Sequence, residues 1–340
     1  MDLKNSFKNR RRAKKALLFS LISLLFSALF ITLFSQNILT TQEDRIISSN
    51  IRVKVIDTYV RNFEVYLGDS VRVSSYKTLD AITVYRDSSG TKFFASRDQF
   101  RSAFNNCMMC GYFDCTTNAT SCGLNGDHLT AKIENVVNLS LHQLNINTTY
   151  AIHSINITQN YPFEVEVTIN LSYNVTDNSG VNNYARWNRT QVITESVTII
   201  GLLDPLGYMN DSTNTYARRI NSTQICDIGE TCWDFTNTQA FYLERSFRYY
   251  ANGTSFLQRY WNDYAPSDCC GIETIIHPLE IAGIRLNNSY IDHYYWSGNY
   301  TCTAANNIVN VTFGTDSVHF DEIGSSRYGL SNDAVIYCRP

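Results

Sequence analysis

The sequence has little proline and none of the short motifs that mark common enzyme classes. Five prolines occur in 340 residues. There is no HExxH, GxSxG or P-loop motif, and no glycine-rich dinucleotide fingerprint. The six histidines show no metal-ligand spacing, so we expect them at surface or turn positions. These absences predict a protein that is not an enzyme and that uses neither a metal nor a cofactor.

Basic residues are scarce beyond the N-terminus, which argues against a nucleic-acid surface. The net charge of the chain is −3, and seven basic residues precede residue 16, so the remainder is clearly acidic. The seven are Lys4, Lys8, Arg10, Arg11, Arg12, Lys14 and Lys15. We interpret this basic head as a topology signal and expect no nucleic-acid partner.

One apolar run interrupts a sequence that is otherwise rich in polar residues. Residues 16–34 are nineteen residues without charge, proline or glycine. As a helix they would span about 28 Å, which fits a bilayer. Because cytoplasmic flanks carry excess lysine and arginine, the N-terminus should lie inside and the chain from about Gln36 outside. The sequence therefore predicts a single-pass cell-membrane protein with an extracellular C-terminal ectodomain and membrane lipid as a partner.

Cysteines and glycosylation sequons agree with that orientation, because all of them lie beyond the apolar run. The ten cysteines are Cys107, Cys110, Cys115, Cys122, Cys226, Cys232, Cys269, Cys270, Cys302 and Cys338. The Asn-X-Ser/Thr acceptors are Asn118, Asn138, Asn147, Asn156, Asn170, Asn174, Asn188, Asn210, Asn221, Asn252, Asn287, Asn299 and Asn310. We expect a disulfide-bonded glycoprotein.

The cysteine spacing leaves alternatives for the first four. In CMMCGYFDCTTNATSC a zinc site would suit a reducing compartment, and a redox-active CxxC would need a thioredoxin-like βαβ context that the sequence does not show. Outside the membrane we favour two disulfides. Cys226 and Cys232 should pair locally, whereas the adjacent Cys269 and Cys270 should bond to different partners. The candidate partners are Cys302 and Cys338.

Helical periodicity continues beyond the apolar run. Between residues 35 and 86 there is no proline, and apolar residues recur mostly three to five positions apart, which predicts an amphipathic helical stalk. Gly68 is the expected bend, with Asp69 or Ser70 capping a second, shorter helix. The stretch IRVKVIDTYV also alternates, so a strand there is the alternative.

From about residue 131 the hydrophobic period changes to two. In PFEVEVTINLSYNVTD the odd-numbered residues are apolar and the even-numbered ones polar, which predicts a strand with one wet face. Glu164 and Glu166 share the wet face and could suit a glycosidase, but we interpret them as its solvated side. Further strands are predicted in NIVNVTFG and at 136–146, 151–158, 190–200 and 333–338, forming antiparallel sheets.

The predicted fold class is α+β. An N-terminal transmembrane helix and amphipathic helical stalk precede an antiparallel β-sandwich-like ectodomain. The cluster of Gly, Pro, Asn and Asp in GLLDPLGYMNDSTNT marks an internal boundary. The predicted segments are a basic cytoplasmic leader (1–15), a transmembrane helix (16–34), the stalk (35–86), a Cys-rich connecting region (87–130), a β domain (131–203) and a C-terminal β-rich disulfide-bonded domain (204–340).

Aromatic residues gather near the C-terminus, in SFRYYANGTSFLQRYWNDYAP and SYIDHYYWSGNY. Tyr and Trp beside Asn and Asp suit stacking on sugar rings or contact with a protein, although such residues also fill cores. Asp292 and His293 should point to opposite faces of a strand, which argues against a catalytic pair. The binding candidates are Tyr260, Trp261, Tyr295 and Trp296.

The N-terminus carries a resemblance to a known family. A short, very basic leader ends at Lys15-Ala16 and is followed at once by Leu17 and the apolar helix. This resembles the class III leader of archaeal type IV pilin-like proteins, and implies cleavage after Ala16 and packing of the helix with other copies in a filament. Leu21 stands where bacterial pilins have an acidic residue, and the ectodomain is large for a simple pilin.

The overall layout also resembles uncharacterised archaeal single-pass secreted surface proteins. Small residues at Ala16, Ser20, Ser23 and Ser27 form a stripe that would let helices approach closely in lipid, or that a solitary anchor simply tolerates. The sequence therefore predicts a membrane-anchored surface protein with a structural role, as in a pilin-like filament subunit. The alternative is a monomeric surface binding module, adhesin-like or lectin-like, that recognises glycan or protein through the C-terminal aromatics.

Overall fold

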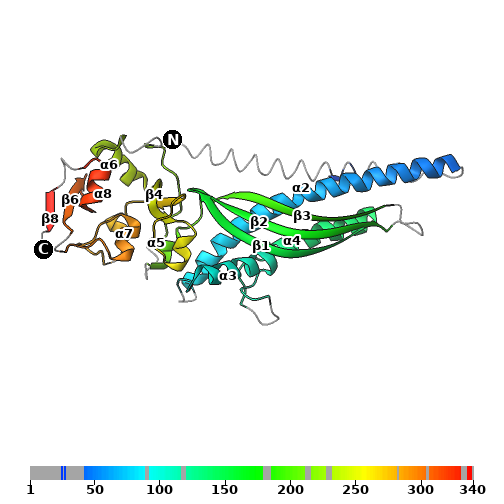
Figure 1. Ribbon diagram of the computed structural model, residues 1–340, viewed down its shortest axis with the longest axis horizontal. Helices are drawn as coiled ribbons and strands as arrows, with labels where there is room; N and C mark the ends of the chain where they lie inside the picture. Colours follow the sequence, from blue (N-terminus) through cyan, green and yellow to red (C-terminus); the bar gives the residue numbers. More distant parts are fainter. Residues whose placement is uncertain are drawn as a thin grey trace. The chain divides into compact units, whose positions relative to one another are not determined.

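A computed structural model shows an α+β protein with a long N-terminal helix followed by small antiparallel sheets, as predicted (Figure 1). It describes residues 24–25, 27, 42–88, 92–115, 120–178, 185–210, 216–226, 232–281, 283–303, 306–330 and 335–338. Two compact units divide the chain. The first holds residues up to 66 with 134–151 and 172–190, and the second holds 67–133, 152–171 and 191–340.

The predicted leader and transmembrane helix lie outside the described residues, apart from Leu24, Leu25 and Ser27. Within the described ranges, no helix combines the length and the apolar content that a bilayer crossing requires. The predictions of an anchor at 16–34 and of cleavage between Ala16 and Leu17 therefore stay predictions.

The stalk is one continuous helix, α2 (Gln42–Ser88), of 47 residues. The bend predicted at Gly68 is therefore wrong, and so is the alternative of a strand through 51–60. A Cβ atom at residue 68 would lie 2.6 Å from Glu195 Oε1 on β3 (Arg186–Thr198). Because Oε1 is the movable end of the Glu195 side chain, this contact does not require glycine at residue 68.

Three long strands form a sheet with the order β1-β2-β3. β1 is Ile146–Tyr161 and β2 is Glu164–Asp177. Ile199 N donates to Phe163 O, and the Thr168 and Thr194 hydroxyls lie 3.1 Å apart, consistent with antiparallel pairing of β2 and β3. The odd-numbered residues of β2 are buried, which confirms the predicted alternation.

The strand predicted at 136–146 is wrong, because this segment lies almost wholly in α4 (Leu129–Leu144). Leu129, Ile133 and Ser140 are its buried residues, a spacing of four and seven that belongs to a helix. The change of hydrophobic period to two from about residue 131 suggested a strand, but the pattern over the sixteen residues of α4 is helical.

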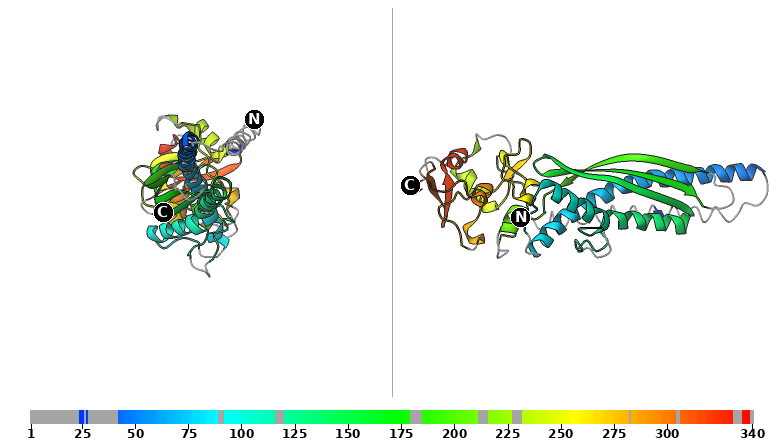
Figure 2. Two further views of the ribbon diagram at one scale, coloured as in Figure 1. Left: turned by 90° about the vertical axis from the view of Figure 1, so that its right-hand side faces the viewer. Right: turned by 60° about the horizontal axis from the view of Figure 1, so that its bottom comes forward.

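In the first unit, helices α2 and α4 pack along one face of the sheet (Figure 2). Phe63 of α2 meets Tyr173 of β2 edge to face, with ring centroids 5.4 Å apart. Arg52 Nη2 donates to Leu144 O at 2.6 Å, at the C-terminus of α4, and its guanidinium pairs with buried Asp177 at 2.9 Å. A cation at this helix end is favourable because the last carbonyl groups lack partners within the helix.

The C-terminal part of the second unit is built from short elements around an aromatic core. Its strands form one antiparallel pair, β4-β5, and one antiparallel three-stranded sheet, β7-β6-β8, where a sandwich-like arrangement was predicted. The strands are β4 (Arg248–Ser255), β5 (Gly271–Glu273), β6 (Ile308–Phe313), β7 (Asp316–Asp321) and β8 (Val335–Cys338). The helices are α5 (Pro205–Asn210), α6 (Phe235–Glu244), η2 (Gln258–Trp261), η3 (Pro278–Glu280), α7 (Asp292–Ser297) and α8 (Glu322–Arg327).

Four disulfides are seen among the described residues: Cys107–Cys122, Cys110–Cys115, Cys226–Cys232 and Cys269–Cys270. The first two start from α3 (Arg97–Cys110), which ends at Gly111 in the left-handed conformation. The prediction that the adjacent Cys269 and Cys270 bond to different partners is wrong. Both lie in one turn before β5 and bond to each other. Cys302 is also disulfide-bonded.

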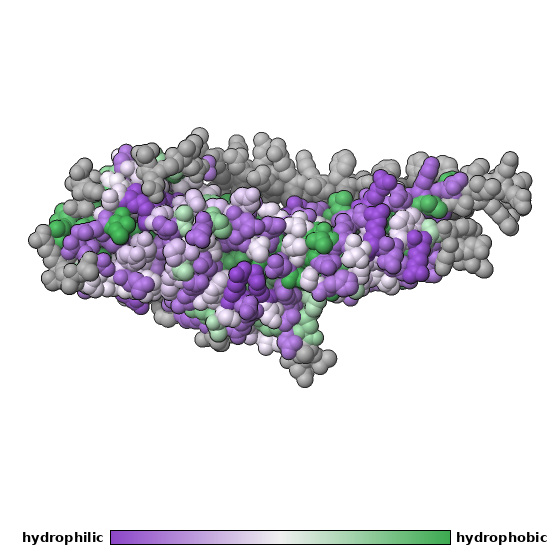
Figure 3. Space-filling model, in the orientation of Figure 1, coloured by the Kyte–Doolittle hydropathy of each residue, from purple (hydrophilic) through white to green (hydrophobic). Residues whose placement is uncertain are grey.

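This number of disulfides indicates an extracytoplasmic protein. The face in Figure 3 agrees with exposure to water, because the described residues on it are mostly hydrophilic and the hydrophobic ones form small, separate groups.

The segment DPLG starts a helix. The Asp204 carboxylate accepts hydrogen bonds from the Leu206 and Gly207 backbone amides, at 3.2 and 3.3 Å, and Pro205 takes the first helical position of α5. Gly207 is buried, and a Cβ atom there would lie 1.8 Å from the ring of buried Tyr216. Only glycine fits between this helix and that ring.

Replacing Gly207 with alanine should therefore destabilise the protein by about 1–3 kcal/mol through overpacking. Gly68→Ala is the matched control, because it adds the same methyl group against the movable end of Glu195 and favours the helix. Urea unfolding of the full-length protein in detergent measures both. Equal stability of the two variants would contradict the packing described for α5.

Candidate functional site

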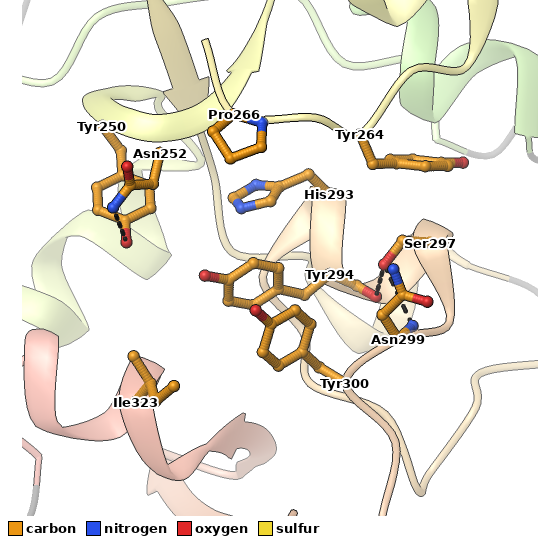
Figure 4. Close-up of a pocket in the computed structure, with 10 residues that line it drawn as sticks. All are labelled: Tyr250, Asn252, Tyr264, Pro266, His293, Tyr294, Ser297, Asn299, Tyr300 and Ile323. Carbon is orange, nitrogen blue, oxygen red and sulfur yellow. Dashed lines mark hydrogen bonds between the residues drawn. The ribbon is translucent and has the colours of Figure 1, made fainter. Parts of the chain in front are cut away.

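A cavity of about 460 Å³ opens in the second unit, between β4, α7, α8 and the loops beside them (Figure 4). Its lining consists of Tyr250, Asn252, Tyr264, Pro266, His293, Tyr294, Ser297, Asn299, Tyr300 and Ile323. Apart from one histidine, this lining holds aromatic, amide, hydroxyl and aliphatic groups, with no carboxylate, lysine or arginine. Such a surface suits a ligand that is polar but uncharged.

Local sequence explains how these side chains reach one place. Tyr250 and Asn252 are two residues apart on β4, so they share a face, while Tyr249, directly before Tyr250, points elsewhere and is 49 % exposed. α7 is closed by Gly298, whose φ of 70° belongs to the left-handed region. This turn brings Tyr300 back onto α7, where its ring stacks on that of Tyr294 with centroids 3.8 Å apart.

The tyrosines present both ring surface and hydroxyl groups to the cavity (Figure 4). The stacked pair of Tyr294 and Tyr300 forms one wall, and Tyr250 stands opposite beside Asn252. Burial raises the pKa of Tyr294 well above its usual value, so its hydroxyl remains a hydrogen-bond donor at neutral pH. Ser297 Oγ donates to Tyr294 O at 3.0 Å and accepts from the Asn299 backbone amide at 3.2 Å, which holds the loop after α7 in place.

Asp292 and His293 depart from the strand arrangement that was predicted. Both begin the helix α7, both are buried, and His293 Nδ1 lies 3.1 Å from Asp292 Oδ1. The surface or turn positions predicted for the histidines are also wrong for His277 and His319, which are buried. Neighbouring residues in a helix are only about 100° apart, so two adjacent side chains can point inward together.

Behind α7 lies a buried ionic network. Arg259, on η2, is completely buried, and its Nη1 lies 3.0 Å from Asp204 Oδ1 and 2.7 Å from Asp292 Oδ2. Burial alone would raise the pKa of Asp292, but Arg259 and His293 lower it to about 2. Burial raises the pKa of Asp204, against the opposing effect of Arg259. One guanidinium thus holds two carboxylates, and Asp292 is ionised at neutral pH.

A second group completes the network. Glu273 on β5 pairs with Arg248 at 2.6 Å and with Arg327 at 2.9 Å, and it accepts a hydrogen bond from Tyr328 at 3.0 Å. Burial would raise the pKa of Glu273, but Arg327 and Arg248 lower it. His293 Nε2 lies 4.0 Å from Glu273, between the two groups.

Three carboxylates and three guanidinium groups therefore balance beneath the cavity. They come from η2, β4, β5, α7, α8 and Asp204 directly before α5, and β4, α7 and α8 also supply lining residues. Among the residues that the structure describes, no group of three or more His, Cys, Asp or Glu side chains is arranged to hold a metal ion. We interpret the network as the support that positions the cavity walls.

The binding candidates from the sequence do not line the cavity. Tyr260 is buried against Phe100, with stacked rings 4.5 Å apart, and Tyr295 is a core residue, so a surface role for these two is wrong. Trp261 is half-buried and donates to Asp263 at 3.3 Å, and half-buried Trp296 packs on the Tyr295 ring at 4.8 Å.

The aromatic segments nevertheless supply most of the cavity lining. Sequence reasoning missed Tyr250, Asn252, Tyr294 and Tyr300. The signals that could have found them are the spacing of two in RYYANG and the glycine after DHYYWS, which marks the end of a short helix.

Sequon asparagines that fall in the described residues are exposed or half-buried, and none is buried. The exposed ones are Asn138, Asn147, Asn156, Asn188, Asn221, Asn252, Asn287 and Asn299. Asn170, Asn174, Asn210 and Asn310 are half-buried, and Asn118 lies outside the described residues.

Comparisons with protein-family models, with curated proteins and with solved structures gave no match to this chain. A function must therefore be inferred from the chain's own residues. The cavity over a charge-balanced base is the feature with the most specific chemistry.

The network predicts a pH-dependent cost for losing its shared cation. Arg259→Met leaves Asp204 and Asp292 buried without their partner, so the free energy of unfolding should fall by about 3–5 kcal/mol at pH 7. Without the cation, burial raises the pKa of both carboxylates, and they protonate as the pH falls. The deficit should therefore shrink toward pH 4.

Arg219→Met is the control, because Arg219 is 58 % exposed and pairs with Asp80 at 3.5 Å. Its loss should be about 1 kcal/mol or less, with little dependence on pH. Urea unfolding from pH 4 to 7 compares the two variants. The same small loss in both would contradict the role of Arg259.

In the unaltered protein, ionised Asp292 contributes stability above the ordinary pKa of about 4, and this contribution disappears as the pH falls toward 2.

Proposed function

We propose that this protein is a membrane-anchored surface protein whose C-terminal cavity binds a carbohydrate. The single observation that carries the proposal is the lining, in which tyrosine rings alternate with amide and hydroxyl groups and no carboxylate, lysine or arginine is present. Sugar rings offer C–H faces for stacking and hydroxyl groups for hydrogen bonds, so both kinds of side chain find a partner. The volume is within the range of about 300–1,000 Å³ usual for small-molecule sites.

Binding is a better match to this site than catalysis. The lining contains one histidine, whose Nε2 lies 4.0 Å from buried Glu273, and one serine, whose hydroxyl group is engaged by Tyr294 O and the Asn299 backbone amide. A hydrolase needs an acid and a base, or a nucleophile, in reach of the substrate. We therefore propose a lectin-like or adhesin-like role without enzymatic activity.

The location in this proposal rests on two features. The disulfides indicate an oxidising compartment, and the apolar run 16–34 behind a basic head supplies the anchor, with the N-terminus inside. The ectodomain would then present its cavity outside the cell.

Tyr300→Ala should weaken saccharide binding about tenfold or more, because it removes the outer ring of the stacked wall. Tyr249→Ala is the matched control, since Tyr249 is also a partly exposed tyrosine but does not line the cavity. A glycan array probed with full-length protein in detergent identifies a ligand, and titration of that ligand compares the variants.

Two results would count against the carbohydrate proposal. One is the absence of any glycan signal with the wild-type protein even after enzymatic removal of its own N-linked glycans, and the other is a signal that both tyrosine variants reduce equally. In either case the cavity would remain a candidate contact for a surface protein, which a pull-down with the same variants would address.

We also propose, as a second candidate, a pilin-like structural role in which copies pack through the N-terminal helix. The leader ending at Lys15-Ala16, the small-residue stripe and the uninterrupted course of α2 support it. If a leader peptidase acts, the mature protein should begin at Leu17. N-terminal sequencing of native protein tests this. An intact Met1 would contradict the pilin-like filament role and would be compatible with a membrane-anchored binding protein.

A further inference from the structure

Two residues of the cavity lining are themselves glycosylation acceptors. Asn252 belongs to the sequon Asn252-Gly253-Thr254 and Asn299 to Asn299-Tyr300-Thr301. Both side chains are exposed, and they stand on opposite sides of the cavity, one on β4 and one after α7 (Figure 4). The central residue of the second sequon is Tyr300, part of the stacked wall.

The geometry leaves both amide groups accessible at the rim. Asn252 Nδ2 donates to Tyr250 Oη at 3.4 Å, which is near the long limit for a hydrogen bond and hence weak. Asn299 is held through its backbone amide by Ser297, and its side chain extends from the loop. A sugar joined to either nitrogen would begin within reach of the tyrosine rings.

We infer that N-linked glycans on Asn252 and Asn299 cover this cavity, so that the protein's own sugars compete with an external saccharide for the tyrosine wall. The competition rests on the proposed function, because it takes the cavity to be a saccharide site. A tethered sugar has an effective concentration in the millimolar range. At about 10 mM, against an intrinsic Kd of about 1 mM, it would lower the apparent affinity for a free saccharide about tenfold.

The modification requires a co-substrate, which would be a lipid-linked oligosaccharide phosphate. Nδ2 of the asparagine bonds to C1 of the first sugar while the bond from C1 to the phosphate oxygen breaks. The amide releases one proton, and the lipid phosphate leaves with the electron pair. No oxidant or reductant is involved.

The burial of the Thr254 hydroxyl group determines when Asn252 can be glycosylated relative to folding. Thr254 is fully buried and its Oγ1 has no hydrogen-bond partner among the residues that the structure describes, whereas Thr301 is half-buried. A transferase that reads the threonine hydroxyl must therefore act on Asn252 before β4 folds. The same fact makes Thr254→Val a conservative substitution. Valine has nearly the shape of threonine, and among the described residues the Thr254 hydroxyl group makes no hydrogen bond that the change would break.

The experiment uses the full-length protein from its native membrane or an expression host that glycosylates it. Thr254→Val with Thr301→Val removes both sequons and keeps both asparagines, while Thr254→Ser with Thr301→Ser retains the sequons. Asn138→Gln with Asn188→Gln removes two exposed sequons that do not line the cavity. Glycopeptide mass spectrometry reads occupancy, and hydroxyl-radical footprinting reads the exposure of Tyr250 and Tyr300 without any ligand.

The expected result is a glycan on Asn252 and Asn299, a severalfold rise in Tyr300 footprinting in the valine variant, and about a tenfold gain in affinity for the saccharide found on the array. The serine and glutamine controls should match the wild type. Unmodified Asn252 and Asn299 in the native protein would overturn the inference. So would occupied sites whose removal leaves footprinting and affinity unchanged.

Failure of the proposed function would look different. If no saccharide binds even the valine variant, while Tyr300 footprinting still rises, the glycans cover the cavity but the cavity is not a saccharide receptor. That outcome would overturn the inference that the protein's glycans compete with an external saccharide, and it would support the inference that they cover the cavity.

Discussion

The C-terminal part of the second unit depends on Arg259, a completely buried cation between two carboxylates that are distant in the sequence. Asp204 uses the same carboxylate to cap α5, and Asp292 begins α7, so a single guanidinium joins the starts of two helices. Its Nη2 also donates to Ile272 O on β5 at 2.6 Å. Removing a charge from water is costly unless it is paired and hydrogen-bonded. Both terminal nitrogens of Arg259 are paired or hydrogen-bonded, whereas its Nε has no partner among the described residues.

Charge balance beneath the cavity explains why its walls need no charge of their own. Glu273 pairs with Arg248 and Arg327, and Arg259 pairs with Asp204 and Asp292. The formal charges of this network beneath the cavity therefore sum to zero. The base fixes β4, α7 and α8, and these elements present tyrosines, amides and a hydroxyl group. An uncharged, aromatic surface on a rigid support is the physical basis for proposing a neutral, polyhydroxylated ligand, whether it is tethered or free.

Regular patterns in the sequence predicted the parts of the fold that they govern. β2 alternates without exception and forms as expected, because one face of a three-stranded sheet packs and the other is wet. Residues 136–146 were misassigned because a short stretch with an apparent period of two outweighed a helical spacing that extends over all of α4. Asp292 and His293 were misassigned for a related reason, since a helix of six residues is too short to show a period.

By itself, the sequence determined the broad class of the protein: an α+β chain with a long helix, antiparallel strands, paired cysteines and accessible sequons. These follow from local composition and periodicity, which a reader can measure along the chain. The cavity was decided by tertiary structure alone. Whether Tyr260 fills a core or Tyr300 forms a wall depends on which distant segments meet, and that is set by the pairing of Arg259 with Asp204 and Asp292 across 55 and 33 positions of sequence. No local pattern encodes such a pairing, because its energy exists only when the segments are folded together.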